Sequence, residues 1–330
     1  MLSRVAESIY WMSRYIERAD NVARFIDVNL HMILDMVVGP ETQWMPLVST
    51  TGDTKEFIER YGVGTKESVI RFLTFDSTYS NSILSCVKRA RENARSVREV
   101  ISSEMWEQIN SFYLMVTDAA RNVTQALDSP RDFYAEIRKA SQLFAGVTDS
   151  TMSRGEGWHF YRFGTMLERG DKTSRILDVK YFILLPSVSH IGTPYDDIQW
   201  SAVLKSIGGF EMYRKQYGLI SPRDVVEFLV LDRHFPRAIQ YCVSRAEESL
   251  YTISGSERGT FRSSAEQKMG QLRAEIAYTP IEDIITSGLH EFIDGLQTKV
   301  NLIGESVHDT FFALRPYNTP GFNQRQFQSQ

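Results

Sequence analysis

The sequence predicts an all-α protein, folded as a single large helical bundle of two tandem-duplicated halves related by a pseudo-twofold axis. Apolar residues recur at the spacing of one helix face over most of the 330 residues, and the alternation typical of strands is nearly absent. A charged helical pattern at residues 15–28 returns at residues 166–179. No linker rich in glycine, serine or proline separates the halves near residues 150–155, which favours one interlocked bundle over two separate domains.

Cap and breaker residues place the helices. Gly39 and Pro40 end the first helix, Ser102 begins a later one, Pro186 follows the second charged pattern, and Ser263–Glu266 form a capping box. In the first half we expect helices over residues 2–38, 77–101, 103–127 and 131–151, with shorter pieces over 41–64 and 65–75. In the second half we expect helices over 156–184, 236–253, 264–278 and 280–312, with shorter pieces over 196–207, 211–217 and 222–231.

The repeated pattern is Φ-Φ-Glu-Arg-x-Asp-x-x-x-Arg-Φ-Φ-Asp-Val, where Φ is apolar. On a helix its charged residues share one stripe, opposite an apolar stripe. Ion pairs on a solvated helix face are worth only roughly 0.3–0.5 kcal/mol each. Apolar residues border this stripe, however, and the charges agree between the copies where other residues differ, so we expect a buried or partly buried network rather than a solvated face. Its expected members are Glu17, Arg18, Asp20, Arg24, Glu168, Arg169, Asp171 and Arg175.

The repetition extends beyond this pattern. Residues 15 and 166 are 151 positions apart, whereas the later matches of Cys86 with Cys242 and Arg89 with Arg245 are 156 apart, which fits one longer loop. We therefore expect a first helical half at residues 1–152 and a second at 153–315. Residues 316–330, rich in Gln, Asn and Pro, are expected to form a mobile tail.

Composition argues against several classes of partner. The formal net charge of −4 gives no overall attraction to nucleic acid or an anionic membrane, and no apolar run reaches the roughly 20 residues of a membrane span. The N-terminus enters an amphipathic helix directly and does not resemble a signal peptide. We expect a cytoplasmic protein without a cofactor, since no phosphate-binding glycine loop, nucleophile elbow or zinc-ligand cluster is present.

Glu17–Arg18 and Glu168–Arg169 are the first candidate functional residues. Paired acids and guanidiniums could bind the amine and carboxylate of a substrate, or the charged tail of a partner. The alternative, which we favour, is structural: each arginine fixes another helix of the bundle. Adjacent residues on a helix point about 100° apart, so the two members of each pair can serve different neighbours.

Arginines along residues 89–98 form a second candidate. Arg91, Arg95 and Arg98 share one helix face near Arg89 and could hold a phosphate or another anion; the alternative is a solvated face balanced by acidic neighbours. The second half keeps only Arg245 of this set, so we do not expect nucleic-acid binding.

Cysteines and histidines supply two weaker candidates. Cys86 and Cys242 match in the repeat, and no histidine is placed to activate them, so we expect buried small residues. The pairs Glu156/His159 and Glu305/His308 have the Glu-x-x-His spacing of di-metal helical bundles. They do not correspond under the repeat, so a metal site is a minor alternative.

Several blocks of the sequence resemble the bacterial alpha-E family, an all-helical domain named for a Glu-Arg motif. They are residues 1–20, Ala90–Arg98 with Trp106, and Glu156–Trp158 before Leu167–Arg169. Members are typically encoded beside, or fused to, a circularly permuted ATP-grasp protein, often with a transglutaminase-like protease. The resemblance implies a role in making and trimming peptide or amide bonds, and it carries over no catalytic residue.

We therefore expect a non-catalytic helical accessory protein of an ATP-grasp-type amide ligase, which holds the ligase or presents a peptide or carrier. A metal- or carboxylate-dependent enzyme inside the bundle is one alternative. A homo-oligomeric structural scaffold, suggested by the repeat, is another.

Overall fold

The computed structural model describes residues 1–35, 44–184 and 194–313. Within these ranges all regular elements are helices, which confirms the predicted all-α class. The first are α1 (Ser3–Asp35), α2 (Met45–Thr51), α3 (Thr54–Tyr61), α4 (Lys66–Ile70), the π-helical turn η2 (Arg71–Phe75), α5 (Ile83–Ser96), α6 (Ser103–Arg121), α7 (Val123–Ala126) and α8 (Pro130–Thr151). The others are α9 (Glu156–Leu184), α10 (Pro194–Ile207), α11 (Phe210–Tyr217), α12 (Pro222–Leu231), α13 (Ile239–Ser254), α14 (Ser264–Tyr278), α15 (Ile281–Ser287), α16 (Leu289–Val307) and the π-helical turn η4 (His308–Phe312).

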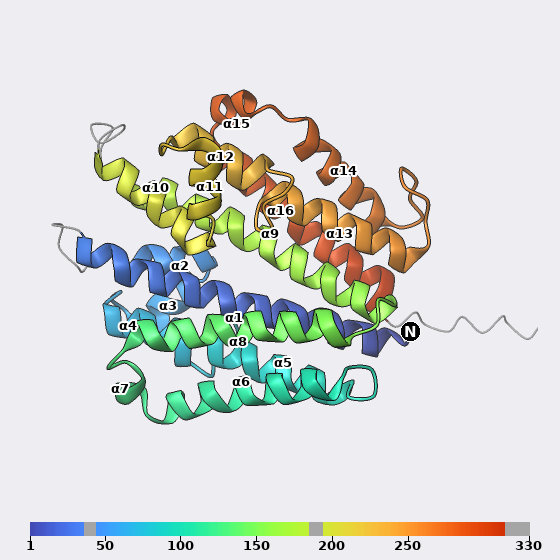
Figure 1. Cartoon of the computed structure of the whole chain (residues 1–330), viewed down its shortest axis with the longest axis horizontal. Coiled ribbons are helices and arrows are strands. Elements are labelled where there is room, and N and C mark those ends of the chain that lie inside the picture. Colours follow the sequence, from blue (N-terminus) through green and yellow to red (C-terminus); the bar gives the residue numbers. More distant parts are fainter. Residues whose placement is uncertain (36–43, 185–193, 314–330) are drawn as a thin grey trace, which may run out of the picture.

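Helices α1 and α9 lie at the centre of the bundle (Figure 1). They pack on each other, while α1 also packs on α5 and α8, and α9 on α13 and α16. The expected boundary between residues 152 and 153 falls in the turn between α8 and α9. Contacts cross this boundary in both directions, because α2 packs on α9 and α10 packs on α1.

The two central helices approach closely where Ser13 faces Gly164. A Cβ atom on Gly164 would lie 2.3 Å from Ser13 Oγ and 2.7 Å from the carbonyl oxygen of Tyr10. Ser13 and Gly164 are 151 positions apart, and each precedes the glutamate of its charged pattern by four residues. Small residues at this crossing therefore let the two patterns reach each other.

Side-chain caps begin several helices, and those at Ser102 and Ser263 are expected from the sequence. The hydroxyl groups of Thr65, Ser102 and Ser263 each accept a backbone N–H from the residue three positions later. Ser263 also forms the reciprocal capping box, because the Glu266 carboxylate accepts the N–H of Ser263. These local bonds place the starts of α4, α6 and α14.

Some boundaries differ from the prediction. The helix expected from residue 77 begins at Ile83, because the carboxylate of Asp76 accepts two backbone N–H groups just after it and fixes a turn. Asp232 does the same before α13, which begins at Ile239 rather than at residue 236. Residues 36–38 of the first expected helix and the tail at 316–330 lie outside the described residues.

Two expected helices are interrupted. The helix expected over 280–312 breaks at Gly288, whose φ of +95° suits glycine and separates α15 from α16. The helix expected over 103–127 breaks at Asn122, between α6 and α7.

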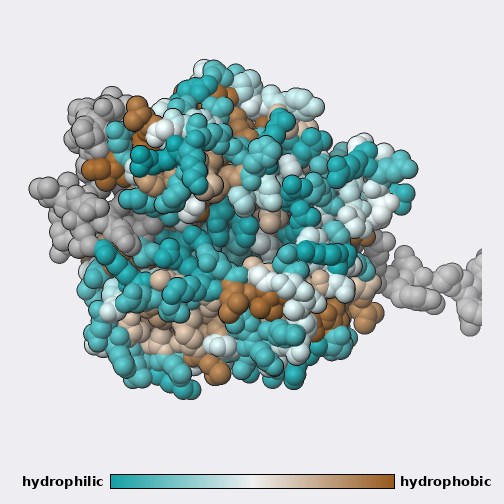
Figure 2. Space-filling model, in the orientation of Figure 1, coloured by the Kyte–Doolittle hydropathy of each residue, from teal (hydrophilic) through white to brown (hydrophobic). Residues whose placement is uncertain are grey.

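The visible surface is mainly polar. In the space-filling view, hydrophobic residues form small separate groups bounded by hydrophilic ones (Figure 2). Among the helices of the described ranges, none combines the length and the apolar character needed to cross a lipid bilayer.

We expect Gly164→Ala to lower the free energy of unfolding by about 2 kcal/mol, because its methyl group overpacks the crossing of α1 and α9. Urea unfolding measures the change. Gly146→Ala is the matched control: its new Cβ has no neighbour within 4 Å, and alanine favours a helix interior, so stability should rise by up to about 1 kcal/mol. Equal effects of the two substitutions would contradict the close crossing.

Candidate functional site

The two Glu-Arg pairs bind each other reciprocally across α1 and α9. Arg169 donates to both carboxylate oxygens of Glu17, with Nη2–Oε2 at 2.8 Å and Nε–Oε1 at 3.0 Å. Arg18 does the same to Glu168, with Nε–Oε1 at 2.7 Å and Nη2–Oε2 at 3.0 Å. Each motif thus supplies the acid for one bidentate bridge and the guanidinium for the other.

Additional cations complete each bridge. Arg237, just before α13, donates to Glu17 at 2.9 Å and to Asp20 at 2.6 Å. On the other side Arg14 donates to Glu168 at 2.8 Å, and Lys172 lies 3.6 Å from the same carboxylate. Sequence reasoning missed Arg14 and Arg237, because neither is repeated: their counterparts at the 151 and 156 offsets are Thr165 and Asn81.

Two aspartate–arginine pairs extend the network along the helices. Arg24 Nε donates to Asp20 at 2.7 Å and Arg175 Nε donates to Asp171 at 2.9 Å, both across one helical turn. The other oxygen of each aspartate, Oδ1, is buried and has no hydrogen-bond partner among the described residues. The two halves therefore hold matching buried acceptors beside matching arginines.

The last acidic residues of the two patterns bind other helices. Asp27 lies 3.0 Å from Arg138 of α8, and Asp178 lies 2.7 Å from the Nδ1 atom of His290 of α16. The hydrogen bond to Asp178 raises the pKa of His290. These contacts fasten the outer helices to the central pair.

The network is buried, as expected for the charged stripe. Glu17 is 5% exposed and Glu168 is fully buried. Burial alone would raise the pKa of Glu17, but Arg169 and Arg237 outweigh it and lower that pKa to about 2. The cations around Glu168 likewise hold its pKa well below the ordinary value. Both carboxylates are therefore charged at neutral pH, which suits a structural lock and not a general acid or base.

Asp171 and Arg237 show the same balance. Burial disfavours the Asp171 carboxylate, yet Lys172 and Arg175 lower its pKa to about 2. Burial lowers the pKa of Arg237, and the positive charges of Arg24 and Arg169 lower it further. Its carboxylate partners Glu17 and Asp20 act in the opposite direction but do not outweigh these effects. A guanidinium nevertheless remains charged at neutral pH.

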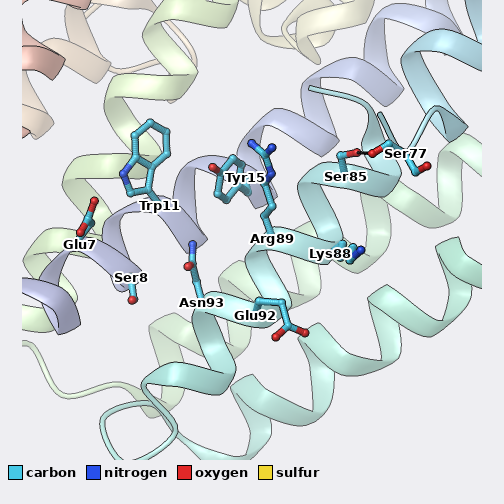
Figure 3. Close-up of a pocket in the computed structure, with 10 residues that line it drawn as sticks. All are labelled: Glu7, Ser8, Trp11, Tyr15, Ser77, Ser85, Lys88, Arg89, Glu92 and Asn93. Carbon is cyan, nitrogen blue, oxygen red and sulfur yellow. Dashed lines mark hydrogen bonds between the residues drawn. The ribbon is translucent and has the colours of Figure 1, made fainter. Parts of the chain in front are cut away.

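Arg89 and Arg245 match in sequence but lie in different surroundings. Arg89 stacks over the ring of Tyr15 at 5.8 Å and lines an open pocket of about 540 Å³ (Figure 3). Arg245 donates to both oxygens of Glu248 at 2.9 Å, and Arg162 also donates to that carboxylate at 3.3 Å. Arg89 is thus available to a ligand, whereas Arg245 belongs to a surface ion-pair cluster.

The predicted basic stripe of Arg91, Arg95 and Arg98 does not lie on one helix, because α5 ends at Ser96 rather than at residue 101 and Arg98 follows it. Two of its arginines pack on aromatic side chains of α6. Arg91 lies over the rings of Trp106 and Tyr113, and Arg98 lies over Trp106. Arg95 pairs with Glu92 at 2.9 Å. Arg91 and Arg98 thus contribute to helix packing. Arg89, which lies beside the stripe, lines the pocket instead.

The cysteines are buried and free, as expected. Burial raises the pKa of the Cys86 thiol to about 11 and that of Cys242 to about 12. Both thiols therefore stay protonated, and neither is poised as a nucleophile.

The two Glu-x-x-His pairs lie apart from the charge network. Glu156 binds the N-terminal ammonium group at 2.7 Å, and burial lowers the pKa of His159. Glu305 and His308 are exposed at the end of α16. In the described part of the chain, no three histidine, cysteine, aspartate or glutamate side chains come together as metal ligands.

We expect Arg169→Met to lower the free energy of unfolding by about 3 kcal/mol, because Glu17 loses its bidentate partner inside the bundle. Arg121→Met is the matched control, since Arg121 pairs with Asp118 at the surface with side chains 72% and 70% exposed. Its effect should stay below about 0.5 kcal/mol. Equal urea midpoints for the two variants would show that the buried bridge adds nothing.

Acid should lower the free energy of unfolding, because the buried carboxylates of the network stabilise the fold only in their ionised form. The pKa of Glu17 is near 4.5 when unfolded and about 2 when folded, so its contribution is complete above about pH 4.5 and disappears as pH falls toward 2. Glu17 alone accounts for roughly 3 kcal/mol of that loss. Urea unfolding at several pH values should show a shallower acid slope for Glu17→Gln than for the parent. Parallel slopes would contradict the lowered pKa.

Comparison with known proteins shows which family and which individual proteins this sequence resembles. A family model described as a predicted alpha-helical domain with a conserved ER motif, named Alpha-E, matches residues 1–312. An uncharacterized protein of Mycobacterium bovis and two of Mycobacterium tuberculosis are each 22% identical over 340 residues. These matches cover 94% of this chain but only 37% of each relative. No solved structure gives a significant match. Because the family model covers nearly the whole sequence, the chain belongs to the Alpha-E family.

Proposed function

We propose that this protein is a helical accessory protein of an ATP-grasp-type amide ligase system and is not itself the catalyst. The reciprocal Glu-Arg bridge carries this proposal. It uses the motif charges to hold α1 against α9, with both carboxylates ionised and saturated by cations. When the motif charges are used to hold two helices together, they make the bundle rigid and are not free to catalyse a reaction. The catalytic groups would then belong to a partner protein.

The length of the relatives supports a partner. This chain spans little more than a third of the mycobacterial proteins that it matches, so there the same module is part of a longer protein. The family resemblance supplies the partner's class: an ATP-grasp-type ligase, often with a transglutaminase-like protein. Proteins that are encoded beside each other or fused, as the resemblance implies for this family and the ligase, are typically components that act together. An ATP-dependent partner would also favour a cytoplasmic location.

We further propose that the bundle arose by tandem duplication and keeps a pseudo-twofold relation. Matching aromatic pairs support this origin: Phe72 stacks on Tyr79 at 3.9 Å, and Phe228 stacks on Phe235 at 4.6 Å, with an offset of 156. The exchange of partners between the two Glu-Arg motifs has the same symmetry. After a duplication, surface residues of one half can change while the residues of the shared core stay the same.

Affinity purification of the tagged chain from its own host tests the proposed partnership. We expect mass spectrometry to recover an ATP-grasp-type ligase, together with a transglutaminase-like protein, at levels well above a tagged unrelated helical protein. Amide formation from ATP, an amine and a peptide should then require the ligase and increase when this chain is added. Ligation by the isolated chain, or the repeated absence of a ligase, would overturn the proposal.

A carboxylate- or metal-dependent activity inside the bundle is the second candidate. The buried oxygen atoms Asp20 Oδ1 and Asp171 Oδ1, which lack partners among the described residues, favour it. Elemental analysis of the purified protein would support this candidate if it found about two equivalents of iron or manganese per chain. Light scattering would separately reveal a homo-oligomeric scaffold.

A further inference from the structure

We propose that the pocket between α1 and α5 binds the carboxylate end of a peptide of three or four residues. The pocket has a volume of about 540 Å³ and opens to solvent (Figure 3). The choice of a peptide rests on the proposed role beside an amide ligase, whereas the charge pattern of the ligand comes from the pocket itself. The lining residues that matter for the ligand are Glu7, Trp11, Tyr15, Lys88 and Arg89.

Aromatic rings line the middle of the pocket. Trp11 and Tyr15, one turn apart on α1, stack at 5.5 Å with an interplanar angle of 28°. Arg14, which is anchored to Glu168, lies over the Trp11 ring at 5.0 Å and helps to fix its position. Both rings are only partly buried, so they offer a fixed apolar surface to a flat or aliphatic side chain.

Opposite charges occupy the two ends. Because α1 and α5 run antiparallel, Ser8 meets Ser96 at one end and Tyr15 meets Arg89 at the other. Glu7 lies at the first end, and Arg89 with Lys88 at the second (Figure 3). None of these three charged groups forms an ion pair with another residue in the described ranges, so each can pair with a ligand.

The matching positions of the second half lie on α9 and α13, and there ion pairs occupy the place of the pocket. The helix arrangement alone therefore does not require a pocket. Arg162 stands where the first half has Trp11, at an offset of 151, and it reaches Glu248, which matches Glu92 at an offset of 156. Arg245, the match of Arg89, binds the same Glu248. Ion pairs thus bridge α9 and α13 at the positions that line the pocket in the first half.

The spacing of the charges defines the ligand. Residues 7 and 15 are eight positions apart, which corresponds to about 12 Å along a helix, or three to four residues of extended peptide. A carboxylate would receive a forked pair of hydrogen bonds from Arg89, aided by Lys88. A side chain would rest on Trp11 and Tyr15, and a basic group would reach Glu7. The preferred ligand is therefore a peptide with a free carboxylate, an apolar side chain beside it, and a cation near its other end.

Calorimetric titration of the whole chain tests this site. The probe is a synthetic tetrapeptide with lysine first, phenylalanine last and a free carboxylate; the comparison peptide ends in an amide. We expect the amide to bind about tenfold more weakly, because it forfeits the charge-assisted bonds to Arg89. Arg89→Met should weaken the free-carboxylate peptide by a similar factor and remove the preference between the two peptides.

Arg245→Met is the matched control, since it alters the corresponding arginine of the second half. It should leave peptide affinity unchanged within about twofold, because Arg245 already binds Glu248. Arg89 is exposed, so an unchanged melting temperature would show that its variant folds normally. Equal binding of the two peptides, equal effects of the two variants, or no saturable heat at millimolar peptide would overturn the proposal. These titrations need no ligase, so their failure is distinct from failure to recover a partner.

Discussion

The reciprocal bridges between Glu17 and Arg169 and between Glu168 and Arg18 constrain the rest of the structure. Removing four charges from water is costly, and only close, bidentate geometry offsets that cost. Because each helix holds the acid for one bridge and the guanidinium for the other, α1 and α9 can satisfy both bridges in only one register and crossing. The small residues Ser13 and Gly164 make the necessary approach possible. Outer helices then attach to this fixed pair, through Arg237, Arg138 and His290.

The same constraint separates stability from ligand binding. Carboxylates held at a pKa of about 2 do not exchange protons at neutral pH, and thiols raised to about 11 and 12 are not nucleophiles. Side chains other than these buried carboxylates and thiols are therefore better candidates for catalysis or ligand binding. The pocket between α1 and α5 has such groups, and one of its aromatic rings, Trp11, packs on Arg14, which also binds Glu168. The side chain of Arg14 therefore connects the reciprocal Glu-Arg bridges to the pocket.

Some of the sequence positions that match between residues 15–98 and 166–248 keep the same residue and others do not, and the difference follows from what each side chain contacts. The Glu-Arg and Asp-Arg pairs agree in both halves, because a change on one side would leave a charge buried without its partner. The surface positions around Arg89 and Arg245 have no such restriction. One half fills them with an ion-pair cluster, and the other leaves a pocket lined by Trp11 and Tyr15. A shared core with one altered face is consistent with a binding role for that face.

The sequence by itself determined the helical class, the charged stripe and most helix boundaries, because helix periodicity and caps such as Ser102 and Ser263 act within a few residues. It did not locate the breaks at Asn122 and Gly288, or the turns after Asp76 and Asp232, where local bonds compete with a continuous helix. Only the tertiary structure decided that each glutamate binds the other motif's arginine, and that Arg14 and Arg237 join them. These partners are distant along the chain, or unrepeated, and become neighbours only when α1 crosses α9.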